Sequence, residues 1–182
     1  GFLTALAAGV VLVRRYRLEW LPTLDVIIPS LALAHAIGRV GCLMAGCCWG
    51  KACALPWAVT YHDPRAAANV GTPLGLPLHP FPVYEGLYDL ALYALLARLY
   101  WRRPRPGVVF AVYLVLYGLG RFFLELTRGD AARGFPFGGV LSTSQLISLG
   151  MLVAGAVMLA VVARSAAEGA AETSGGGRAK SR

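Results

Sequence analysis

Five apolar runs, separated by short polar or basic stretches, constrain the fold of this chain more than any other feature. Each run is near or below the roughly 20 residues that a helix needs to cross a bilayer. The chain is 57% hydrophobic and only 14% charged, whereas about a quarter of the residues in a soluble domain are charged. The pattern predicts an all-α, polytopic integral membrane protein with about five transmembrane helices, at residues 1–13, 24–44, 83–101, 107–126 and 144–163.

These helices are expected to form one transmembrane domain, residues 1–163. The polar, Gly- and Pro-rich stretch 51–82 is too irregular for a span and is expected to form a small extramembrane cap. Residues 164–182 lack apolar periodicity and are expected to be a disordered tail. Because the first run is already apolar at Gly1, we expect the chain to be truncated at its front end, with upstream spans missing.

The basic residues predict the orientation in the membrane. The net charge is +8, and most Lys and Arg residues fall in the clusters 14–17 and 98–105 and in the tail. Alternating spans place all three on one side, which the positive-inside rule assigns to the cytoplasm together with the C-terminus. Clusters between apolar runs do not form a nucleic-acid-binding face, so no nucleic-acid partner is expected. The cap is then expected on the outer side.

Polar side chains recur at helical spacing inside three of the runs, where residues four apart share a face. They predict a polar pocket toward the outer leaflet, and two arginines in it suit a phosphate, which a guanidinium binds in a bidentate manner. A phospholipid headgroup is the natural phosphate at that depth, and membrane lipids are expected partners. The alternative is that these groups are internal ion pairs that only hold the helices together. The residues concerned are His35, Arg39 and Cys42, then Glu85, Asp89 and Tyr93, then Tyr117, Arg121, Glu125 and Arg128.

Four cysteines follow the first of these stripes in the pattern C-x4-C-C-x4-C, at Cys42, Cys47, Cys48 and Cys53. This is not a usual zinc spacing, so no metal and no cofactor is expected. The simplest interpretation is that they are small packing residues. A disulfide on an oxidising outer face comes next, with Cys53 as the easiest partner of Cys47 or Cys48, and a reactive thiol or metal ligand comes third.

His79 stands just before the third span and is a candidate proton acceptor, because imidazole titrates near neutrality. The alternative is an ordinary exposed loop histidine.

The order and spacing of these motifs resemble the prolipoprotein diacylglyceryl transferase family, over Gly1 to about Ala163. The markers are Gly38-Arg39-Val40-Gly41 with Gly46 and Trp49-Gly50, Pro56-Trp57, His79-Pro80 with Tyr84-Glu85, Tyr117-Gly118 with Arg121-Phe122 and Glu125, Arg128 with Asp130, and Ser144-Gln145-Leu146.

The resemblance implies a seven-span enzyme of the bacterial plasma (inner) membrane, with its active site toward the outer leaflet. Such an enzyme transfers the diacylglyceryl group of phosphatidylglycerol to the lipobox cysteine thiol of a preprolipoprotein. Carried over by motif, Arg39 and Arg121 would hold the lipid phosphate, while Glu85 and Glu125 would orient those arginines. Tyr117 would line the same cavity. Beside these, His35 on the stripe of Arg39 is a candidate lipid-binding residue, and His79 is the candidate base for the thiol within this chain.

The sequence departs from the family's pattern at the cysteines. The family signature has asparagine where Cys42 stands, and then Asn-Gly-Glu where this chain has Ala45-Gly46-Cys47. Two alternatives therefore stay open. One is a phospholipid-binding or lipid-transport membrane protein without transferase activity, and the other is a membrane thiol-redox or metal protein that uses the cysteine cluster.

Overall fold

Long helices carry the fold of this computed structural model, which describes residues 1–130 and 141–179, the side chains of Phe2 and of residues 166–179 excepted. The helices are α1 (Phe2–Arg15), α2 (Trp20–Ala45), α4 (Phe81–Trp101), α5 (Val108–Leu124) and α6 (Thr143–Ala179), with a 3-10 turn, η1 (Glu125–Thr127), directly after α5. Each predicted span coincides with one of them, with ends that agree to about one helical turn except at the C-terminal end of α6. The predicted all-α membrane fold is confirmed.

Three of these helices are long and apolar enough to cross a membrane: α2, α5 with η1, and the Thr143–Ser165 part of α6. The other two fall short for different reasons. Helix α1 has only 14 residues, and α4 carries three charged residues, Glu85, Asp89 and Arg98. The number of spans therefore stays a prediction.

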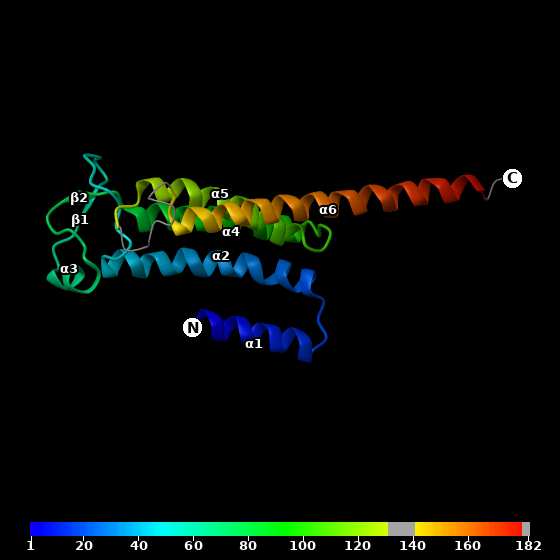
Figure 1. Ribbon diagram of the computed structural model, residues 1–182, viewed down its shortest axis with the longest axis horizontal. Coiled ribbons are helices and arrows are strands. Elements are labelled where there is room, and N and C mark those ends of the chain that lie inside the picture. Colours follow the sequence, from blue (N-terminus) through cyan, green and yellow to red (C-terminus); the bar gives the residue numbers. More distant parts are fainter. Residues whose placement is uncertain (131–140, 180–182) are drawn as a thin grey trace.

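Helices α2, α4, α5 and α6 run side by side, and α1 lies apart along the outside of α2 (Figure 1). The buried core lies between α2, α4 and α5 and consists of Ile28, Ala32, Leu92, Leu96, Val109 and Tyr113. Many large apolar side chains on the outer faces remain exposed, among them Ile37, Val153 and Val161. A helix that is apolar all round is typical of a membrane span, because lipid covers those faces.

Small residues let α5 and α6 approach each other closely. A Cβ atom at Gly118 would lie 2.8 Å from the backbone oxygen of Ser148, and one at Gly155 would lie 2.9 Å from that of Ala111. Glycine at such positions is typical of helix pairs that pack in membranes.

Residues between α2 and α4 fold into a compact cap at one end of the bundle (Figure 1). It contains α3 (Pro64–Val70) and a two-stranded antiparallel sheet of β1 (Val59–Thr60) and β2 (Pro77–Leu78), in which Val59 pairs with Leu78. Its position outside the membrane stays a prediction.

Helix α6 differs from expectation at its C-terminal end. The helical backbone continues through Ala179, past Ala163, into the segment that was expected to lack regular structure. The alanines and glutamates that follow Arg164 are good helix formers, which favours this continuation.

Candidate functional site

Three helices meet at Glu85, which lies between two arginines near the cap end of the bundle. Its Oε2 atom lies 3.1 Å from Nε of Arg39 on α2, and its Oε1 atom lies 3.6 Å from Nε of Arg121 on α5. Glu85 is 1% exposed. Neither oxygen has a well-aligned hydrogen-bond partner among the described residues, so charge rather than hydrogen bonding holds this group. The structure thus brings together three of the residues that the polar stripes singled out, one from each helix.

Gly86 allows this close approach of α4 to α2. A Cβ atom at that position would lie 3.3 Å from Cβ of Arg39, which leaves little room for a side chain. An apolar groove of about 310 Å³ lies beside it, between the two helices. Arg39 is the one charged residue in its lining, which is otherwise formed by residues such as Leu33, Val40 and Leu87.

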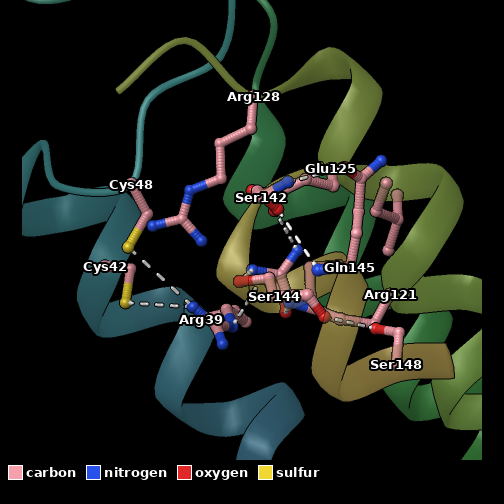
Figure 2. A network of polar contacts seen from close by, with 12 residues as sticks. Arg39, Cys42, Cys48, Arg121, Glu125, Arg128, Ser142, Ser144, Gln145 and Ser148 are labelled. Atoms are coloured by element: carbon pink, nitrogen blue, oxygen red, sulfur yellow. Dashed lines mark hydrogen bonds and ion pairs between the residues drawn. The ribbon is translucent and has the colours of Figure 1, made fainter. Parts of the chain in front are cut away.

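The two arginines differ in how many of their donors are used. Arg121 pairs through Nη1 with Glu125 Oε2 at 2.8 Å and donates from Nη2 to Ser144 Oγ at 3.1 Å. The terminal nitrogens of Arg39, by contrast, make only long contacts to sulfur among the described residues, at 3.9 Å to Cys42 and 4.0 Å to Cys48 (Figure 2). Arg39 therefore keeps donors for an anion, whereas Arg121 is held by protein groups.

His35 and Tyr117 lie together one helical turn from the arginines, since each precedes an arginine by four residues. Their ring centroids are 5.8 Å apart, and Nδ1 of His35 is buried without a hydrogen-bond partner among the described residues. Asp89, one turn after Glu85, is 1% exposed. The polar stripe on each of the three helices thus continues for one helical turn beyond the arginines, on the side away from the cap.

Arg128, the last residue of the polar stripe predicted for the fourth span, belongs to the same site. It follows η1 in an extended conformation rather than continuing the α5 stripe, and Asp130 holds it through two hydrogen bonds of 2.7 and 3.0 Å. Its guanidinium lies 4.9 Å from the ring centroid of the buried Phe81, and that of Arg121 lies 5.7 Å from the same ring. Burial lowers and the nearby Asp130 raises the pKa of Arg128, with a net rise, so the group stays cationic.

Three of the four cysteines gather close to Arg39. All four are free thiols, and the Sγ atoms of Cys42, Cys47 and Cys48 lie within 4.8 Å of one another. Cys53 is not in this group, and its pairing with Cys47 or Cys48, the second interpretation of the pattern, stays a prediction. Burial, together with hydrogen bonds to the neighbouring thiols, raises the pKa of Cys47 to about 12.

His79 lies in the segment that leads into α4. Its Nδ1 atom is 3.3 Å from the hydroxyl of Tyr84, which also accepts a 2.8 Å hydrogen bond from the indole of Trp57. Among the described residues, the imidazole thus has its hydrogen-bond partner in Tyr84 rather than in the arginine group. Its role as proton acceptor stays a prediction.

Backbone hydrogen bonds tie the cysteine loop to the segments on both sides of it. Gly50 donates to the carbonyl of His79, Lys51 donates to Thr127, and Gly129 donates to Trp49. A Cβ atom at Gly50 would lie 2.5 Å from His79, so only glycine fits there. The loop, His79 and Arg128 are therefore held in one unit over the arginines.

The fold and the site define a class: a helical membrane protein whose bundle holds two arginines around one buried carboxylate. The chain belongs to the prolipoprotein diacylglyceryl transferase family, since the model of that family matches residues 1–161.

Relatives with established names support this assignment. The chain is 40% identical over 138 residues to the phosphatidylglycerol–prolipoprotein diacylglyceryl transferase of Clostridium tetani, which covers 74% of this chain and 51% of the relative. It is 36% identical over 134 residues to the second such enzyme of Clostridium perfringens, covering 74% and 49%, and 31% identical over 159 residues to that of Finegoldia magna, covering 87% and 58%. The chain spans about half the length of the curated relatives it matches.

Proposed function

We propose that this protein transfers the diacylglyceryl group of phosphatidylglycerol to the cysteine thiol of a prolipoprotein, at the outer leaflet of the bacterial plasma membrane. The observation that carries the proposal is the Arg39–Glu85–Arg121 group, which joins three helices around one buried carboxylate. The names of the relatives give both substrates and the reaction.

The depth of Arg39 supports a lipid headgroup as its ligand. Helix α2 has 26 residues and is therefore about 39 Å long at 1.5 Å per residue, whereas the hydrocarbon core is about 30 Å thick. Arg39 lies six residues before the last residue of α2, Ala45, about 9 Å along the axis. With α2 centred on that core, the Cα atom of Arg39 lies about 5 Å inside its edge, close to the headgroups, and the apolar groove beside it has the chemistry to receive an acyl chain.

The reaction requires negative charge to grow on a departing phosphate. The thiolate of the acceptor cysteine attacks the glycerol carbon, a sulfur–carbon bond forms, and the carbon–oxygen bond to the phosphate breaks to release glycerol phosphate. Guanidinium groups fixed in a site of low dielectric stabilise that charge. Arg39 has donors to offer the phosphate, Arg121 adds positive charge, and Glu85 and Glu125 orient the arginines. His79 is the proposed proton acceptor for the thiol.

The test is the transfer of labelled diacylglycerol from phosphatidylglycerol to a lipobox peptide by the full-length protein. We expect Arg39→Ala to lower the rate by about a hundredfold or more, as the loss of a transition-state donor does elsewhere, and Arg39→Lys to restore only part of it. Arg65→Ala is the matched control, because Arg65 is an exposed arginine of the cap. Phosphatidylglycerol binding without any modified peptide would overturn the transferase proposal in favour of a lipid-binding protein.

A further inference from the structure

Three thiols lie together beside the phosphate-binding arginine, at the place where this chain departs from its family's sequence pattern. Cys42 is on the last turn of α2, and the chain reverses at Gly46, which has a left-handed φ of 70°. Cys48 also has a left-handed φ, 57°, a conformation that is uncommon outside glycine. The two reversals return Cys47 and Cys48 to Cys42, so that all three sulfur atoms lie within 4.8 Å of one another.

These distances fit a thiolate metal site. With metal–sulfur bonds of about 2.3 Å, as in zinc sites, the sulfurs stand roughly 3.8–4.0 Å apart, so a small inward movement would complete the site. Thiolates select soft ions such as zinc and copper(I) over magnesium or calcium. Among the described residues, no fourth histidine, cysteine or carboxylate joins the group. A zinc ion held there would keep an open position, as catalytic zinc sites do and structural ones do not.

The surrounding charges also fit. Three thiolates and a divalent ion carry a net charge of −1, which needs a cation nearby in a half-buried place. Arg39 supplies one, with Nη1 3.9 Å from Cys42 Sγ and 4.0 Å from Cys48 Sγ. Arg128 interacts electrostatically with Cys48 from the other side, and Figure 2 shows its guanidinium beside that sulfur. Two arginines thus face a group that is neutral as free thiols and anionic as a metal complex.

We propose that Cys42, Cys47 and Cys48 bind a zinc-class metal ion whose open fourth position takes the sulfur of the acceptor thiol. The second half of this proposal rests on the proposed function. The three cysteine thiols lose their protons to the solvent and the acceptor thiol loses its proton to His79, as in the proposed function, and neither metal nor sulfur changes oxidation state. A metal-bound thiol is deprotonated outright, so the ion would supply the nucleophile beside the arginine that holds the phosphate. This proposal departs from the sequence-based expectation of no metal. That expectation rested on the spacing of the cysteines, which does not show that α2 and the loop bring three of the thiols together.

Metal binding is tested first on the reduced, full-length protein, loaded with Zn²⁺ and dialysed. We expect one zinc per chain, and with Co²⁺ a sulfur-to-cobalt charge-transfer band. Cys42→Ser and Cys48→Ser should each weaken binding by about a hundredfold or more, since even an outer-shell partner contributes roughly 10–100-fold. Cys53→Ser is the matched control and should bind as the wild type does. Absence of stoichiometric zinc, or equal binding by Cys48→Ser, would overturn the proposal.

A measurement without substitutions guards against variants that fail to fold. Zinc should protect Cys42, Cys47 and Cys48 of the wild-type protein from maleimide while Cys53 stays reactive, as read by peptide mass spectrometry. Equal labelling with and without zinc would contradict the site. So would a disulfide among the three thiols in protein isolated without reductant.

The open position is tested with the cobalt-loaded protein and two peptides. A lipobox peptide should change the charge-transfer band, and the same peptide with serine for its cysteine should not; no change with either would overturn the assignment of the acceptor thiol. The two proposals can fail separately. Zinc binding without any lipid transfer would remove the proposed function and leave the metal site, whereas transfer at full rate by zinc-free protein would leave the function and overturn the metal's part in it.

Discussion

At the scale of single residues, the position of Glu85 shows how two cations can share a half-buried pocket. Its carboxylate compensates Arg39 and Arg121 together, and its side chain is 1% exposed. With Glu125 also paired to Arg121, two carboxylates face the two guanidiniums, so the charges are nearly balanced before any ligand arrives. An incoming phosphate has to compete with Glu85 for the arginines, and it can do so best at Arg39, whose terminal nitrogens contact only sulfur among the described residues.

Removing this one charge should therefore destabilise the protein and make it depend on anionic lipid. We expect Glu85→Gln to lower the free energy of unfolding by about 3–5 kcal/mol, as when a buried ion pair loses one partner. Phosphatidylglycerol should recover more of the stability than a zwitterionic lipid does, because its phosphate replaces the missing charge. Thermal unfolding in vesicles of each lipid measures this. Glu19→Gln, at an exposed carboxylate before α2, is the control.

Should Glu85→Gln unfold at the wild-type temperature, or respond equally to both lipids, the carboxylate does not balance the arginines as the distances indicate.

At the scale of the elements, glycines and hydrogen bonds between α2 and the start of α5 determine how the helices of the bundle pack. Gly120 on α5 lies against the ring of Tyr88 on α4, whose hydroxyl donates to the carbonyl of Leu116. Asp25 on α2 reaches the start of α5 and accepts hydrogen bonds from the backbone nitrogens of Gly107, at 2.6 Å, and Phe110, at 2.8 Å. These contacts fix α5, and hence Arg121, relative to the other two helices of the site.

A methyl group at Gly120 should separate α4 from α5. Its Cβ atom would lie 2.1 Å from Cζ of Tyr88, and overpacking a core costs about 1–3 kcal/mol or more. We expect Gly120→Ala to lower the unfolding temperature and the transfer rate together. Gly150→Ala on α6, where nothing lies within 4 Å of the added atom, should leave both unchanged. Equal effects of the two substitutions would contradict this packing.

Asp25 accepts hydrogen bonds from backbone nitrogens at the start of α5, and its replacement should lower the free energy of unfolding. The loss should be smaller when the new side chain can still accept a hydrogen bond. Asp25 is 5% exposed and caps two backbone donors, so we expect Asp25→Ala to lower the free energy of unfolding by about 2 kcal/mol. Asp25→Asn should lose less, because its amide oxygen still accepts a hydrogen bond. Denaturant unfolding of the purified protein gives both values, and equal losses would show that the charge rather than the acceptor matters.

The sequence predicts some of these elements and not others, for physical reasons. Hydropathy locates the spans because lipid exposure selects long apolar runs, and helical spacing groups His35 with Arg39 and Tyr117 with Arg121 because that spacing is local. The contact from Asp25 to Gly107 joins residues 82 apart and leaves no local pattern. The gathering of Cys42 with Cys48 depends on two left-handed turns that spacing does not reveal. The capping box of Ser142 and Gln145 at the start of α6 has a sequence signature and could have been recognised.

At the scale of the whole molecule, the basic clusters and the candidate site lie at opposite ends. The end of α1 and the connection after it, with Arg14, Arg15 and Arg17, lie at the same end of the bundle as the connection after α4, with Arg102, Arg103 and Arg105 (Figure 1). The cap and the N-terminal half of α4, with Glu85, lie at the other end. The separation agrees with the charge pattern of the sequence and supports one orientation.

We therefore expect the basic end in the cytoplasm and the cap outside, since arginines next to membrane spans are retained on the cytoplasmic side. Alkaline phosphatase, which is active only after export, should be active when fused at Gly71 in the cap and inactive when fused after Arg103. A fluorescent protein that folds only in the cytoplasm should give the reverse pattern at the same two positions. Changing Arg102, Arg103 and Arg105 together to Ala should weaken this contrast, because it removes much of the charge asymmetry, whereas Arg65→Ala in the cap should not weaken it. Active phosphatase at Arg103 would place the arginine site on the cytoplasmic side, where an acceptor at the outer leaflet could not reach it.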